Sequence, residues 1–378
     1  MPKKAIDTYF IFPLLFAVVF IDAKFMGYDL YLWLMPVFVI VAFDNLDKFR
    51  LAFDQTKSFL LVILALIGSE LVNNGSINHI ASILGFVIRY VDLLLLVCVL
   101  NKYYRVGELD KLWVRMTLAL IFIGLFGLAL YFVGLKTSLV APGHREGLIP
   151  SMRSLTFEPN FLAQICLMTL FLNNLTKGEK SILLSGLILT FTRSAILLFI
   201  VGKLFTFFQV WVIEKARMSY LNLMVAFLAI ASSIGLFVLS YKFLYSFLEE
   251  LFNNASAFGR FYAYTIAFEG FIESPIFGKG IFSADTLFST QFGNSHHIFG
   301  AEGWLGSGIA QVAHDLGIVG LLALGNFYYR VYRKINSKYE KIGFVLLVTA
   351  SMLASYNMTE FFIYGYMSFV IASGIENS

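Results

Sequence analysis

The chain has 378 residues; 59% of them are hydrophobic, 14% are charged, and the formal net charge at pH 7 is +4. A soluble globular domain carries fewer apolar and more charged residues, so this composition excludes that class. The small positive charge gives no sign of a basic nucleic-acid-binding surface, and we expect no nucleic-acid partner.

Long apolar stretches recur along the whole chain and predict an all-α, polytopic integral membrane protein, with the lipid bilayer as its first partner. We expect about 12 transmembrane helices, at residues 8–22, 27–43, 58–73, 79–100, 112–135, 159–175, 181–192, 194–213, 219–240, 310–329, 342–356 and 358–374. Several are shorter than the roughly 20 residues of a perpendicular span, so tilted or re-entrant segments are expected. The run 181–213 is too long for one simple span, and we place a break in it near Thr192 and Arg193.

Basic residues predict the orientation of these spans, because lysine and arginine gather in cytoplasmic loops. With both termini in the cytoplasm, the basic segments 102–115 and 330–341 fall inside and few basic residues remain outside. A single span over 181–213 would place the basic segment 330–341 on the outside of the membrane, which is why the break is needed. The whole of 1–378 is then one membrane domain of a cytoplasmic membrane.

Two long segments face the outside in this arrangement. The first extracytoplasmic loop is 136–158, and the large extracytoplasmic loop is 241–309. Apolar residues between charged ones over 256–273 predict an amphipathic helix on the membrane surface inside the larger loop. The polar chemistry of the protein is therefore expected outside the membrane.

Four arginines on the extracytoplasmic side are candidate ligands for an anionic substrate. They are Arg145, Arg153, Arg193 and Arg260. A guanidinium group pairs with phosphate oxygens through two parallel hydrogen bonds, so this set favours a diphosphate or an acidic sugar. The alternative is that they anchor at lipid headgroups or pair with neighbouring glutamates. Arg193 stands between two apolar runs, where an arginine is costly unless it lines a cavity.

The candidate proton acceptors are His296, His297, His314 and Glu158. Histidine exchanges protons near neutral pH, and a carboxylate beside arginines either orients them or acts as the base. The alternative is that the histidines are solvated loop residues. A zinc site is disfavoured because adjacent histidines rarely bind one ion and no cysteine lies near, so we expect neither a metal nor a cofactor.

Four segments resemble motifs of the O-antigen polymerase and O-antigen ligase superfamily of membrane glycosyltransferases. They are Arg153 to Asn160 with its Glu-Pro-Asn ending, Leu189 to Ser194 with its Thr-Arg-Ser, Gly259 to Gly280 with its Arg and its Pro-Ile-Phe-Gly-Lys-Gly, and His314 to Gly320 with its Asp-Leu-Gly-Ile-Val-Gly. The likeness covers about residues 140–325, with the motifs in the family's order.

This resemblance implies an inverting, metal-independent transfer on the extracytoplasmic face of a bacterial inner membrane, on a fold similar to the GT-C class. The donor would be an oligosaccharide on undecaprenyl diphosphate, and the acceptor the end sugar of another lipid-linked repeat unit. Arg153, Arg193 and Arg260 would bind the diphosphate, and Arg145 would assist or bind sugar. A protein that regulates chain length is an implied partner.

Two alternatives stay open. Many ligases carry a His-Asn pair about nine residues before the acidic-Leu-Gly element, where this chain has Gly306-Ser307. This departure leaves the base unassigned and favours a polymerase over a ligase. A lipid-linked oligosaccharide flippase would place charges along a central cavity, whereas here the polar residues gather in two outer loops.

Overall fold

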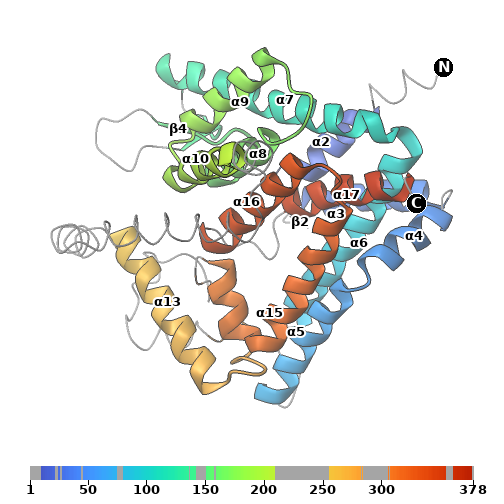
Figure 1. Cartoon of the computed structure of the whole chain (residues 1–378), viewed down its shortest axis with the longest axis vertical. Coiled ribbons are helices and arrows are strands. Elements are labelled where there is room, and N and C mark those ends of the chain that lie inside the picture. Colours follow the sequence, from blue (N-terminus) through green and yellow to red (C-terminus); the bar gives the residue numbers. More distant parts are fainter. Residues whose placement is uncertain are drawn as a thin grey trace.

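The computed structural model describes residues 10–21, 24–25, 28–43, 46–74, 80–135, 137–141, 150–156, 159–208, 255–281, 283, 305, 307–354 and 361–376. This part of the chain is mostly helical, as Figure 1 shows. The predominantly helical character predicted from the apolar runs is confirmed. Two small antiparallel hairpins were not predicted: β1 (Lys24–Phe25) pairs with β2 (Tyr28–Asp29), and β3 (Val140–Ala141) pairs with β4 (Ser151–Met152).

Every predicted span except 219–240, which lies outside the described residues, coincides with a helix. The helices are α2 (Phe12–Phe20), α3 (Leu30–Phe43), α5 (Phe59–Asn74), α6 (Ile80–Tyr103), α7 (Val106–Phe132), α8 (Pro159–Thr169), α9 (Lys177–Leu189), α10 (Arg193–Phe208), α15 (Gly308–Lys334), α16 (Lys338–Ala354) and α17 (Phe361–Glu376). The predicted break in 181–213 is confirmed, because α9 ends at Leu189 and Phe191 adopts a left-handed φ of 52° before α10 begins.

Two further helices of the described residues lie outside the predicted spans. The helix α13 (Ala255–Glu273) confirms the helix expected at 256–273. The helix α4 (Leu46–Thr56) was missed, because its mixture of charged and apolar residues resembles a cytoplasmic loop. It meets α5 at a bend of 60°.

Three helices of the described part are long and apolar enough to cross a membrane: Ile83–Tyr103, Gly107–Phe132 and Gly308–Lys334. The bent pair α4 and α5 makes a fourth if the two count as one span. These helices are those of a membrane protein. The other described helices are shorter or less apolar, so the count of about 12 spans and the GT-C-like fold stay predictions.

The core forms around α6, which packs against α17 and α4, and residues Leu93 to Leu100 of α6 are all buried. Among the side chains that the structure describes, the largest buried one is Trp113 of α7, whose ring contacts Phe20 and two aromatic rings of α17. The Trp113 Nε1–H donates to Thr169 Oγ1 of α8 at 2.9 Å. A buried N–H therefore finds a partner on a neighbouring helix, as it must where water is excluded.

Two groups of helices matter for function. The first is α5, α13 and α15, in which α15 packs against both others, and the second is α8, α9 and α10, in which α8 packs against both others (Figure 1). The helix α16 contacts α8, α10 and α15, so it joins the two groups. The four motifs singled out from the sequence fall on these groups in two pairs.

Candidate functional site

The helix α15 is broken at Gly317, two residues after Asp315. Gly317 has φ 60° and ψ −153°, which is not helical and which residues with a side chain rarely adopt. A Cβ at this position would lie 2.6 Å from the carbonyl oxygen of Pro275. The Asp-Leu-Gly element therefore ends one helical segment and begins another.

The turn at Pro275 to Ile281 satisfies the hydrogen bonds that this break leaves open. The amides of Lys279 and Gly280 donate to the carbonyl oxygens of His314 and Asp315 at 2.7 and 3.2 Å. In the other direction, the amides of Ile318 and Val319 donate to the carbonyl oxygens of Pro275 and Ile276 at 2.8 and 3.2 Å. Helix ends lack partners for these groups, so the turn and the break cap each other.

The close approach of the two main chains requires glycine at the turn. Gly278 has φ 71°, and a Cβ there would overlap the main chain of Asp315 and lie 2.5 Å from its oxygen. The Pro-Ile-Phe-Gly-Lys-Gly run and the Asp-Leu-Gly run, far apart in sequence, thus form one backbone structure.

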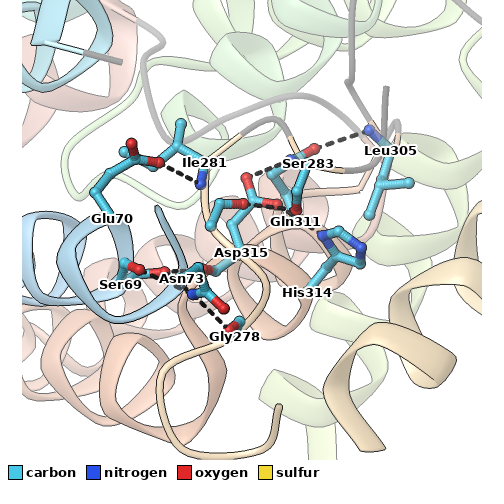
Figure 2. A network of polar contacts seen from close by, with 11 residues as sticks. Ser69, Glu70, Asn73, Gly278, Ile281, Ser283, Leu305, Gln311, His314 and Asp315 are labelled. Atoms are coloured by element: carbon cyan, nitrogen blue, oxygen red, sulfur yellow. Dashed lines mark hydrogen bonds and ion pairs between the residues drawn. The ribbon is translucent and has the colours of Figure 1, made fainter. Parts of the chain in front are cut away.

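The end of α5 binds the same structure through a polar face. Ser69 Oγ donates to the carbonyl oxygen of Asp315 at 2.5 Å, and Asn73 Nδ2 donates to that of Gly278 at 2.9 Å. Glu70 Oε1 accepts from the amide of Ile281 at 3.0 Å (Figure 2). We name Ser69, Glu70, Asn73, the turn 275–281 and residues 311–317 the α15 junction.

Sequence reasoning missed Ser69, Glu70 and Asn73. The available signal was a glutamate near the end of an otherwise apolar predicted span, because such a residue needs a partner inside the protein. The Ile281 amide that Glu70 binds lies more than 200 positions away in the sequence, and no local pattern indicates this contact.

His314 lies at the end of a chain of hydrogen bonds. Its Nδ1 is 2.8 Å from Asp315 Oδ1, and Asp315 Oδ2 accepts from Gln311 Nε2 at 2.6 Å. Gln311 Oε1 accepts in turn from the amide of Leu305 at 2.8 Å (Figure 2). With Asp315 ionised, Nδ1 carries the proton and Nε2 presents a lone pair, which is the arrangement of a histidine base with an orienting carboxylate.

The His314 ring is fully buried against α13. Its exposed fraction is 0%, and Nε2 has no hydrogen-bond partner among the described residues. Gly270 of α13 leaves room for the ring, because a Cβ there would overlap Cδ2 and lie 2.7 Å from Nε2. Beside it, an ion pair between Lys279 and Glu273 ties α13 to the turn, and the hydrogen bond and charge of Lys279 lower the pKa of Glu273.

The other two motifs meet at the start of α10. Thr192 Oγ1 donates to Asn160 Oδ1 at 3.2 Å, which links the Glu-Pro-Asn element at the start of α8 to the Thr-Arg-Ser element. Arg193 is the first residue of α10. Arg153 follows β4, and its Nε donates to the carbonyl oxygen of Ser138 at 2.5 Å. We name Asn160, Thr192 and Arg193 the α10 junction.

The structure describes only part of the predicted site. Glu158, Arg145, His296 and His297 lie outside the described residues. Arg193 and Arg260 are placed by their backbones, in α10 and α13, but their side chains are not described. Of the predicted bases, His314 is the one whose surroundings can be read. Within the described ranges no three His, Cys, Asp or Glu side chains gather as a metal would require.

The fold and these junctions define a helical membrane protein with a buried histidine–carboxylate pair at a broken helix. Residues 181–325 match the model of the O-antigen ligase family, from α9 to the middle of α15. This match includes three of the four motifs and supports the placement of the chain in the O-antigen polymerase and ligase superfamily, so the resemblance is confirmed over that range. No curated protein matches the chain.

Proposed function

We propose that the chain is a polysaccharide polymerase that joins undecaprenyl-diphosphate-linked oligosaccharide repeat units on the extracytoplasmic face of the bacterial inner membrane. The catalytic part of this proposal rests on the hydrogen-bonded chain Gln311–Asp315–His314, which orients one histidine nitrogen as a base. The family match supports a glycan-transferring enzyme, and the Gly306-Ser307 pair in place of His-Asn favours the polymerase over the ligase.

In the proposed reaction an acceptor hydroxyl oxygen attacks the anomeric carbon of the donor sugar. The bond from that carbon to the diphosphate oxygen breaks, and its electron pair leaves with the diphosphate. His314 Nε2 takes the hydroxyl proton, and Asp315 stabilises the imidazolium that forms. The configuration inverts because a single displacement occurs from the opposite face.

The arginines would stabilise the charge that develops on the leaving diphosphate without a metal ion. Arg193 begins α10, so the partial positive charge of the helix N-terminus adds to its own. Arg153, Arg260 and Arg145 are the further proposed ligands. Glu158, His296 and His297 are the alternative bases.

The burial of His314 adds a condition to this mechanism. An acceptor sugar reaches Nε2 only after α13 separates from the ring, because Gly270 lies against that edge of the imidazole. We therefore place a movement of α13 before the chemical step, as is common where a closing element excludes water.

The test is a ladder of surface glycan from cells that lack the chain and are complemented with wild type, His314→Gln, Arg193→Ala or the control Leu322→Ala. Leu322 lies on α15 with 67% of its side chain exposed, so its truncation leaves both junctions intact. We expect wild type and the control to restore long chains and the other two variants to leave single repeat units. A ladder restored by His314→Gln would remove His314 from the mechanism.

The same cells separate the alternatives. Long chains that accumulate on the lipid carrier and never reach their final acceptor would indicate a ligase. Repeat units that stay on the cytoplasmic side would indicate a flippase and overturn the proposed transfer.

A further inference from the structure

The last turns of α5 have two unlike faces. Leu71 and Val72 are 48% and 60% exposed and point away from the protein, whereas Ser69 and Glu70 are fully buried. An isolated carboxylate or hydroxyl is costly in such surroundings unless a partner compensates for the lost water. Polar residues on the inner face therefore need a reason to be there, and the family motifs do not include them.

Each of the three polar residues binds a different part of the break in α15 and the turn that caps it. Ser69 reaches the carbonyl oxygen of Asp315, Glu70 reaches the amide of Ile281, and Asn73 reaches the carbonyl oxygen of Gly278. Asn73 Nδ2 also donates to the carbonyl oxygen of Ser69 at 2.8 Å, which fixes its own side chain. The three contacts fall on the break and on the turn that caps it, so α5 holds both at once (Figure 2).

The contact of Ser69 acts on the residue that orients His314. The carbonyl oxygen of Asp315 accepts from Ser69 Oγ and from the Gly280 amide, while the Asp315 carboxylate holds His314 Nδ1. A shift of the Asp315 main chain would therefore move the carboxylate and the imidazole together. Proton transfer in such a pair depends on placement, since a misplacement of about 1 Å can cost about 100-fold in rate.

We propose that Ser69, Glu70 and Asn73 are positioning residues of the glycosyl-transfer site, which hold His314 and Asp315 in register through the capped break. This inference rests on the proposed function. It assigns a catalytic consequence to the N-terminal half of the chain, outside the range that matches the family model.

Glu70 offers the sharpest pair of variants. Glu70→Gln keeps an oxygen that accepts from the Ile281 amide, whereas Glu70→Ala removes it. Val72→Ala, on the exposed face of the same helix, is the matched control. With purified protein in nanodiscs and a lipid-linked repeat unit as donor and acceptor, we expect Glu70→Ala to lower kcat by about 10- to 100-fold with KM little changed. Glu70→Gln should retain most of the rate, and the control all of it.

A double-mutant comparison separates positioning from general loss of structure. In a His314→Gln background the base is already absent, so Glu70→Ala should cause no further loss. An equal additional loss in that background would overturn the positioning role.

Hydrogen exchange of the peptide 275–281 gives a readout that needs no activity. The amides of Lys279, Gly280 and Ile281 should exchange faster in Glu70→Ala than in wild type, and no faster in Glu70→Gln. Equal exchange and equal kcat in Glu70→Ala and wild type would overturn the inference. A wild-type protein that transfers no sugar while the exchange difference is present would overturn the proposed function instead. If Glu70→Ala does not fold, Asn73→Ala at the exposed end of α5 replaces it in both measurements. This variant removes the hydrogen bond from Asn73 to the Gly278 carbonyl oxygen.

Discussion

The two junctions bring family motifs together by different means. The α15 junction joins its two motifs by four hydrogen bonds between main chains, at 2.7 to 3.2 Å, and adds three side chains from α5. In the α10 junction, the hydrogen bond that the described residues show between the two motifs joins two side chains, Thr192 and Asn160, at 3.2 Å. The first joins main chain to main chain and so fixes backbone position, whereas the Thr192–Asn160 bond joins side chains at the start of a helix. The difference suits a base that must be placed closely and arginines whose long side chains can adjust to a diphosphate.

The largest effect of a single substitution is expected at Gly278, in the α15 junction. Alanine there would require a left-handed φ and would overlap the Asp315 main chain, neither of which a rotamer change relieves. We expect Gly278→Ala to lower the free energy of unfolding by at least about 3 kcal/mol, or to prevent folding. The measurement is thermal unfolding of the purified protein. Gly325→Ala on α15 is the control, since nothing lies within 4 Å of its Cβ, and equal melting of Gly278→Ala and wild type would contradict the expectation.

The next effect should fall on activity more than on stability. Gly270→Ala would place a methyl group against the His314 ring, so the imidazole or α13 must shift. We expect a loss in transfer rate of about 10- to 100-fold, with about 1 to 3 kcal/mol of destabilisation. The rate and the melting temperature are measured on the same preparation, with Gly85→Ala of α6 as the control because its Cβ meets open space. Unchanged transfer would mean that the ring position is not critical.

The α10 junction should tolerate the loss of its hydrogen bond. Thr192→Val removes the hydroxyl that donates to Asn160 and should cost about 1 kcal/mol of unfolding free energy, with folding retained. Thr206→Val in α10, the helix that Thr192 precedes, is the control, because the Thr206 hydroxyl donates to the Gly202 carbonyl oxygen of its own helix. A loss above about 3 kcal/mol from Thr192→Val would show that this junction is as closely held as the first.

The smallest effect concerns pH and lies where α16 meets the end of α8. Burial, together with the charge of Asp110, raises the pKa of Glu340 to about 7, while Asn173 Nδ2 donates to its Oε1 at 2.8 Å. A raised pKa contributes stability that is fully present below the unfolded value of 4.5 and is lost as the pH rises to about 7.

Glu340→Gln removes this titration and retains an acceptor for Asn173. We expect the variant to be more stable than wild type at pH 8 by under about 1 kcal/mol, because the side chain is only partly buried and solvent screens its charge. The difference should vanish below pH 4.5, where both side chains are neutral. Melting curves across this range test the sign, and a variant that is less stable at pH 8 would contradict it.

Hydropathy was sufficient to predict the helices because each apolar run is a local property of the sequence. The break before Arg193 followed from the length of one run combined with the placement of basic residues. By contrast, α4 was missed since its 11 residues include both charged and apolar side chains and have no run long enough to indicate a span.

The candidate site was predictable only where a motif carried it. His314 was among the predicted bases, but its pairing with Asp315 and Gln311 depends on side-chain directions that the sequence does not give. Ser69 and Asp315 are 246 positions apart, so the contact between α5 and the break follows from tertiary packing alone. Glu158 and the loop histidines stay predictions, as do the roles of the four arginines.

The hydrogen bond between Asn73 and Gly278 also constrains the number of times that the chain crosses the bilayer. Two bonded residues share one depth and one side, so the chain must cross the membrane an even number of times between the end of α5 and the turn. The six spans predicted between these points, from 79–100 to 219–240, satisfy this parity. Merging α9 and α10 into one crossing would leave five and bring the turn to the wrong leaflet. A single contact thus ties the sidedness of the C-terminal half to that of the N-terminal half.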